Sequence, residues 1–194
     1  GAGSIAGSGW PADLTKTIYI NGAQVAVIDN NSESFYYSPD NPLSAGTVVR
    51  VESGDYSKEH IVIDLQMTGF DLGSDSILGV ANPGVLTASR SDTWDNVEAT
   101  ADSSGLWTAT FTSDLVAGSY GNLTQADEDG DKTVKFWSIP NPMLTIDKIY
   151  WKTIQGSGWP ADLPKTIFID NVQVAEIDNH STSFYYSPDN PLSA

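Results

Sequence analysis

The chain has 194 residues and no cysteine, and its 25 acidic residues against 9 basic ones give a net charge of −16. This charge repels nucleic acid and anionic lipid headgroups, so neither is an expected partner. The lack of cysteine excludes disulfides and thiolate metal sites. No apolar run approaches the roughly 20 residues that a membrane-crossing helix needs, so no membrane insertion is expected.

A block of 39 residues occurs twice, as residues 7–45 and again as residues 156–194, with an offset of 149 residues. The two copies differ at eight positions and align without a gap. Self-similarity of this kind indicates a tandem-repeat protein. A period of 149 residues is too long for a solenoid repeat and suits two sandwich domains of roughly 75 residues each.

Within the first copy, alternating apolar and polar residues predict strands over residues 17–20, 24–28 and 34–37. Asn21-Gly22 separates the first two, and Asp170-Asn171 takes that place in the second copy. These residue types tolerate a positive φ, so a tight hairpin turn is expected in both copies. Further strands are predicted over residues 47–51 and 60–63.

The next part of the chain predicts strands over residues 76–81, 86–91, 97–101, 106–112 and 133–137. In the fourth of these, Trp107, Ala109 and Phe111 share one face, which is typical of a half-buried strand with its large residues inward. Pro140-Asn141-Pro142 indicates a linker, followed by a strand over residues 143–146. No helical periodicity occurs, so the fold class is all-β.

Two sets of segments resemble known surface proteins. GSGWPAD with its hairpin, and AGTVVRVESGD, resemble immunoglobulin-like repeats of bacterial and archaeal surface proteins, and ATADSSGLWTATF is similar to the domain type that alternates with them. The resemblance implies tandem immunoglobulin-like β-sandwich domains. The function it implies is that of an extracellular, cell-surface structural repeat in a stalk, fibre or adhesin. A glycan- or protein-binding adhesive module on the same fold is the alternative, because fold alone does not determine function.

This interpretation divides the chain into three parts. Residues 1–64 form an immunoglobulin-like domain without its first strand, residues 65–139 form a second such domain, and residues 140–194 begin the next copy of the first. Both copies of the block are then expected to expose unpaired strand edges, which recruit strands from other chains. Neighbouring copies of the chain are therefore the expected partners, in a head-to-tail filament.

Enzymatic motifs are absent from the sequence: it contains no GxSxG, HExxH, P-loop or Rossmann fingerprint. Only His60 and His180 can act as bases near neutral pH, and His180 replaces Asn31 of the other copy. His60 is expected on the surface. We therefore expect no catalytic activity.

Asp127, Asp129 and Asp131 alternate along a short acidic segment that also contains Gly130. Such carboxylates can surround a hard cation, and Ca²⁺ accepts six to eight oxygen ligands. The segment departs from an EF-hand loop, because its glycine is fourth and its twelfth residue is Ser138. A calcium site and a plain turn between two strands both remain open at this point.

Trp10 and Trp159 occupy the same repeat position, each before a proline. They suit either a sugar-stacking platform or packing that closes the sandwich. Lysine–asparagine isopeptide bonds occur in some domains of the kind that this chain resembles. Lys16 and Lys165 also recur, but beside a turn, where exposure is expected.

Overall fold

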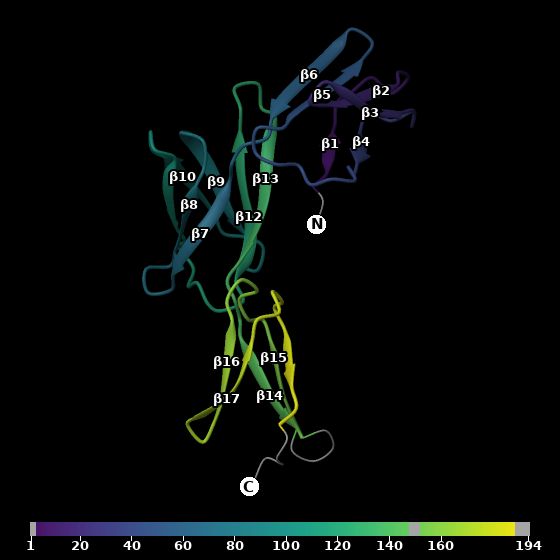
Figure 1. Cartoon of the computed structure of the whole chain (residues 1–194). Helices are drawn as coiled ribbons and strands as arrows, with labels where there is room; N and C mark the ends of the chain where they lie inside the picture. The colour runs from purple at the N-terminus through teal and green to yellow at the C-terminus, as the bar shows by residue number, and fades with distance from the viewer. Residues whose placement is uncertain (1–2, 148–151, 189–194) are drawn as a thin grey trace. The chain divides into compact units, whose positions relative to one another are not determined.

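The computed structural model describes residues 3–147 and 152–188, and these contain β-strands but no α-helix. The all-β fold class is therefore confirmed. The chain forms two compact units. Unit 1 comprises Gly1–Asp114 and Gly121–Trp137, and unit 2 comprises Leu115–Tyr120 and Ser138–Ala194. Figure 1 labels most of the strands.

In unit 1, the first repeat copy builds two antiparallel sheets. A two-stranded sheet pairs β1 (Ile5–Gly7) with β4 (Phe35–Tyr37). A four-stranded sheet has the order β3-β2-β5-β6. Its strands are β2 (Lys16–Ile20), β3 (Ala23–Ile28), β5 (Val48–Ser53) and β6 (Tyr56–Ile61). Their shared core contains Ile5, Ile18, Phe35, Val49 and Val51.

The remainder of unit 1 forms two more antiparallel sheets in a β-sandwich-like arrangement. One sheet has the order β11-β8-β7 and the other β10-β9-β12-β13. The strands are β7 (Gln66–Asp71), β8 (Ser76–Val80), β9 (Gly84–Arg90), β10 (Asn96–Ala101), β11 (Leu106–Thr110), β12 (Tyr120–Ala126) and β13 (Lys132–Ser138).

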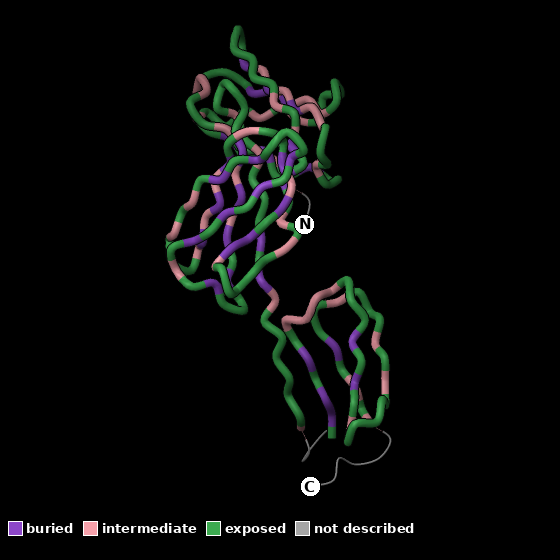
Figure 2. Tube along the Cα trace, turned by 90° about the vertical axis from the view of Figure 1, so that its left-hand side faces the viewer, coloured by how far each residue is buried: buried purple, intermediate pink, exposed green. Residues whose placement is uncertain are grey.

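Side chains from both sheets pack into one core in this region. Trp107, Ala109 and Phe111 are all buried, as their alternation predicts. Phe111 packs against Trp137 of the other sheet, with ring centroids 5.8 Å apart. Figure 2 shows buried positions alternating with more exposed ones along strands of this region. Alternation along each strand thus places the large apolar residues between the sheets.

Unit 2 contains the second repeat copy. One sheet has the order β14-β15-β18, and β16 pairs with β17 in another. The strands are β14 (Met143–Asp147), β15 (Thr153–Ser157), β16 (Lys165–Ile169), β17 (Val172–Ile177) and β18 (Phe184–Tyr186). The core residues Ile154, Ile167 and Phe184 correspond in the repeat to Ile5, Ile18 and Phe35.

The hairpin turn is the same in both copies. Asn21 and Gly22 have φ values of 49° and 79°, and Asp170 and Asn171 have values of 49° and 64°. Two consecutive residues with positive φ are the requirement of the tight hairpin turn that these residue types predict. The positions that differ in charge between the copies, such as Val27 and Glu176, are exposed.

The expectation that the repeated lysines are exposed is wrong. Lys16 is completely buried, and Lys165 is buried as well. Lys16 Nζ donates a 2.6 Å hydrogen bond to the carbonyl oxygen of Ser32, and Lys165 Nζ donates a 2.8 Å bond to that of Ser181. In the first copy the lysine thus binds the loop between β3 and β4 (Phe35–Tyr37), and in the second copy the loop between β17 and β18. Burial is tolerated because the amine is hydrogen-bonded.

Candidate functional site

The acidic segment forms the tight turn that joins β12 to β13. The amide of Asp127 donates to the carbonyl oxygen of Asp131 at 2.9 Å, and Gly130 has a φ of 88°. The turn draws the side chains of Asp127, Asp129 and Asp131 together, with one oxygen of each within 4.8 Å of the others. The plain turn and the convergence of carboxylates are therefore features of the same segment.

Two basic side chains from β6 reach this acidic turn. Lys58 Nζ lies 2.5 Å from Asp129 Oδ2 and 3.6 Å from Asp131 Oδ2. His60 Nδ1 lies 2.7 Å from Asp127 Oδ2, and its Nε2 lies 2.9 Å from the hydroxyl of Thr133. The His60 side chain was expected on the surface; it is 14% exposed and therefore partly buried by these contacts.

These contacts shift the acid–base behaviour of the site. The hydrogen bond to Asp129 raises the pKa of Lys58, and the same bond lowers the pKa of the Asp129 carboxyl. Each charged form stabilises the other. The turn is therefore a charged cluster in which a lysine ammonium already stands beside the carboxylates.

The donor set fits a divalent cation in part. Three converging carboxylates are the hard oxygen ligands that such ions prefer. Asp131 Oδ2 is buried and accepts no hydrogen bond from the described residues. This oxygen lies 3.6 Å from Lys58 Nζ, so a bound ion would replace that ion pair with a closer contact. Lys58 opposes cation binding, because its ammonium group already pairs with the Asp129 carboxylate that an incoming cation would need.

Sequence reasoning identified the three aspartates but not Lys58 and His60. These two lie roughly 70 residues before the turn and reach it only through the fold. The one sequence signal that groups these two residues is their spacing, because residues two apart on a strand point to the same face of the sheet.

The repeated tryptophans pack into the cores of their respective copies. Trp10 meets Phe35 edge-on at 6.0 Å, and Trp159 meets Phe184 at 5.8 Å. Both indoles belong to the residues packed against the core clusters. Both indoles are partly buried, and these contacts agree with the packing interpretation.

A different aromatic residue, Trp94, stands out in the structure. It lies in the loop between β9 and β10, is 84% exposed and has a φ of 60°. A positive φ is unusual for a bulky residue and is held only where surrounding contacts impose it. The sequence analysis made no prediction for this loop, which lies between the strands predicted over residues 86–91 and 97–101.

Ionic and hydrogen-bonded contacts fix both ends of that loop. The buried Arg90 donates to both carboxylate oxygens of Asp92 and to the carbonyl oxygens of Ser113 and Asp114. Asp95 Oδ2 accepts from the amide and hydroxyl groups of both Thr112 and Ser113. These bonds lower the pKa of Asp95, with the Thr112 hydroxyl as the largest cause. Hydrogen bonds of Arg90 and Asp95 therefore anchor the loop on both sides of Trp94.

No protein-family model matches the chain, and no curated protein matches it significantly. In the residues that the structure describes, no helix is long and apolar enough to cross a membrane.

Proposed function

We propose that the chain is a non-catalytic structural repeat of an extracellular, cell-surface stalk, fibre or adhesin. In this proposal its domains are immunoglobulin-like β-sandwiches that assemble head-to-tail through β-strand contacts. The support is a difference between the two repeat copies. Among the described residues, β1 pairs only with β4, whereas its counterpart β15 pairs with both β18 and β14.

The strands β2 and β16, which are counterparts in the repeat, differ in the opposite sense: here the first copy has the additional neighbour. In unit 1, β2 pairs with both β3 and β5, whereas β16 pairs within the described chain only with β17. Among the described residues, each copy thus lacks, at one edge, a neighbouring strand that the other copy has. Open edges present rows of unpaired amide and carbonyl groups, which favour addition of further strands. Contacts between two different edges are heterologous and propagate.

Sedimentation and negative-stain electron microscopy over a range of concentrations test this function. We expect association that grows with concentration and has no fixed end point. Lysine on the open edges, in the double variant Ala6→Lys and Phe168→Lys, should reduce association because charged edges resist pairing. Val27→Glu, a change already present between the repeats, is the control. A chain that stays monomeric at every concentration would remove this function.

For the acidic turn we propose Ca²⁺ as the ion, held by Asp127, Asp129 and Asp131. Three carboxylates provide part of the six to eight oxygen ligands that Ca²⁺ accepts, and water can complete the set. The ion would tie the β12–β13 turn together by balancing its negative charge. Lys58 would then have to release Asp129.

A second candidate function, a glycan-binding adhesive module, is favoured by Trp94. An exposed indole on a loop with hydrogen bonds on both sides offers the flat apolar surface on which a sugar ring can stack. A glycan array that compares the native chain with Trp94→Ala tests it, with Leu106→Ala as a control at another exposed apolar residue. Binding that Trp94→Ala abolishes supports this module. Equal binding by all three proteins would place any glycan site elsewhere.

A further inference from the structure

We propose that Asn30 and Asn179 are acceptor sites for an N-linked glycan. The two asparagines occupy the same position of the repeat. This inference rests on the extracellular, cell-surface function proposed above, because the modification is one of secreted and surface proteins. It goes beyond that function, since it names a covalent modification, its acceptor atoms and the chemical class of its donor.

The sequence pattern of an N-glycan acceptor is Asn-X-Ser/Thr, where X is not proline. It occurs three times in the chain, as NNS at residues 30–32, NLT at 122–124 and NHS at 179–181. The first and the third are equivalent in the repeat. Their middle residues differ, as Asn31 and His180, and so do the residues after the pattern, Glu33 and Thr182. Within this loop the two copies therefore differ only at positions that the pattern leaves free.

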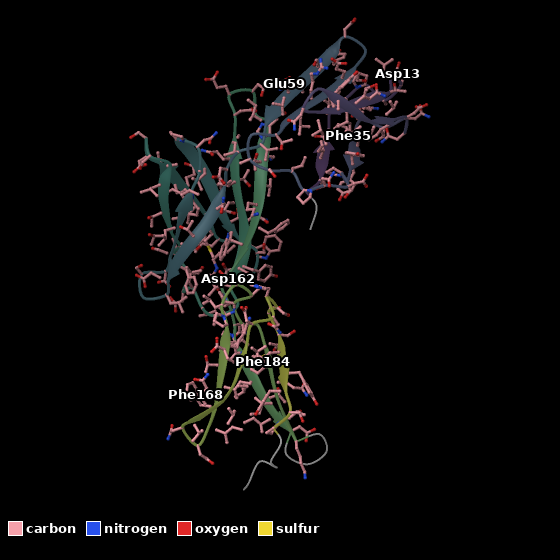
Figure 3. The ribbon with its side chains drawn as sticks, in the orientation of Figure 1. Asp13, Phe35, Glu59, Asp162, Phe168 and Phe184 are labelled. Carbon is pink, nitrogen blue, oxygen red and sulfur yellow. The ribbon has the colours of Figure 1, made fainter. Side chains whose placement is uncertain are left out.

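Both acceptors lie in loops between strands. Asn30 lies between β3 and β4 and Asn179 between β17 and β18, and both residues are exposed. Phe35 and Phe184, which begin β4 and β18, are buried and hold the end of each loop against its core (Figure 3). Each asparagine is therefore accessible on a loop whose position a buried aromatic residue fixes.

The acceptor amide is held by one of its two N–H groups. Asn30 Nδ2 donates a 2.8 Å hydrogen bond to the carbonyl oxygen of Ser34, and Asn179 Nδ2 donates a 2.8 Å bond to that of Ser183. An asparagine amide carries two N–H donors, and the described residues provide a partner for one of them. A sugar can therefore replace the second hydrogen while the bond that shapes the loop is kept.

The hydroxyl group that the pattern requires has the same surroundings in both copies. Ser32 Oγ accepts a 3.2 Å hydrogen bond from the amide of Ser34 and lies 3.3 Å from the Ser34 hydroxyl. Ser181 makes the same two contacts with Ser183. In the second copy the Ser181 amide also donates to Asn179 Oδ1 at 3.2 Å. Asparagine and hydroxyl thus belong to one hydrogen-bonded loop in each copy.

The transfer forms one bond to the sugar and breaks another. Asparagine Nδ2 attacks the anomeric carbon of a sugar whose leaving group is a lipid-linked phosphate or pyrophosphate. A C–N bond replaces one N–H bond, and the bond between the anomeric carbon and the phosphate oxygen breaks, with its electron pair left on that oxygen. The proton passes to a base of the transferase, which the producing cell supplies. No oxidant or reductant takes part.

The third occurrence of the pattern has a different setting. Asn122 lies within β12, opposite Ser89 of β9, and is only partly exposed. Its Oδ1 atom is buried. β12 is an inner strand, paired with β9 on one side and β13 on the other, so a transferase could grip this segment only after the sheet opened. We therefore expect the fold to select the two loops over Asn122.

Glycopeptide mass spectrometry of the full chain, purified from the surface of the cells that make it, tests the sites. Peptides with Asn30 and Asn179 should carry sugar, and the peptide with Asn122 should be unmodified. Ser32→Ala should abolish the sugar on Asn30 alone, whereas Ser32→Thr, which keeps the hydroxyl, should retain it. Asn31→His, a change already present between the copies, is the matched control and should leave the occupancy unchanged.

Unmodified Asn30 and Asn179 in chain recovered from the cell surface would overturn the inference and leave the extracellular function standing. Equal occupancy of Asn122 would overturn it as well, because the fold would then make no selection. Protease treatment of intact cells tests the location separately, and a chain found only inside the cells would reject both the extracellular function and this inference. Glycosylated loops in a chain that stays monomeric in sedimentation would reject only the assembly function.

Discussion

Lys58 on β6 donates a 2.5 Å hydrogen bond to Asp129 Oδ2 across 71 residues of sequence. The ammonium group therefore occupies part of the place that a divalent cation would take in the acidic turn. Lysine and a metal ion would compete for one carboxylate, so Ca²⁺ binding as proposed would depend on a residue outside the acidic segment.

Calcium should stabilise the native chain. At a hundredfold excess over its Kd, an ion that binds only the folded state raises the free energy of unfolding by roughly 2.7 kcal/mol. The melting temperature in millimolar Ca²⁺ should exceed that in chelator, and Asp129→Ala should abolish the difference. Lys58→Met should enlarge it, because the competing ammonium is gone. Equal melting temperatures in Ca²⁺ and chelator would exclude the site.

Truncation of Trp107 should destabilise unit 1. The side chain is 3% exposed and lies between the two sheets, so Trp107→Ala should lower the free energy of unfolding by roughly 3–5 kcal/mol. Urea unfolding of the full chain measures the loss. Leu106→Ala, at the exposed neighbour on the same strand, is the control. A loss below about 1 kcal/mol for Trp107→Ala would contradict its position in the core.

Gly79 should not tolerate a side chain. It lies opposite Trp107 in the β8–β11 register, and a Cβ there would come within 1.9 Å of the carbonyl oxygen of Gln66 and 2.6 Å of the Trp107 ring. Gly79→Ala should therefore cost about 1–3 kcal/mol or more through overpacking. Gly73→Ala, in the β7–β8 loop, should have a much smaller effect. Thermal unfolding of the two variants compares them directly, and similar melting temperatures would count against the packing described.

Asp95 should contribute to acid sensitivity. Its pKa is lowered in the folded chain, chiefly by the Thr112 hydroxyl, so its stabilising effect is present above the unfolded-state value of about 3.9. The contribution is lost as the pH falls through that value toward the folded pKa. Urea unfolding between about pH 6 and 2.5 should show a shallower decline for Asp95→Asn and, more weakly, for Thr112→Val. An unchanged decline in both variants would contradict the role of these bonds.

Much of the fold follows from local sequence. The repeat, the Asn21-Gly22 turn and the inward face of Trp107 depend on residue type and spacing, and the structure has all three. Strands β1, β7, β12 and β15 were not predicted. The inward positions of β12 include Gly121 and Gln125, and Gln125 is buried because its amide exchanges hydrogen bonds with the backbone of Asn82. A glycine and a paired polar residue give no apolar alternation for a pattern to detect.

Only those residues of the acidic site that are neighbours in sequence could be predicted. Asp127, Asp129 and Asp131 converge because one turn holds them. Lys58 reaches them through tertiary structure, and Lys16 is buried because a distant carbonyl at Ser32 accepts its hydrogen bond. Neither partner can be inferred from local composition. The conformation of Trp94 likewise depends on bonds made by residues on either side of its loop.

The near-identity of β2 and β16 has a consequence for folding. During folding, β5 meets two acceptor strands of almost the same sequence, and both belong to its own chain. The contact with β2 closes a loop of roughly 30 residues and the contact with β16 one of roughly 120, a difference of only about 1 kcal/mol in closure entropy. Correct pairing therefore depends less on sequence recognition than on which acceptor is nearer along the chain. Synthesis from the N-terminus reinforces that choice, since β2 and β5 are both complete long before β16 emerges.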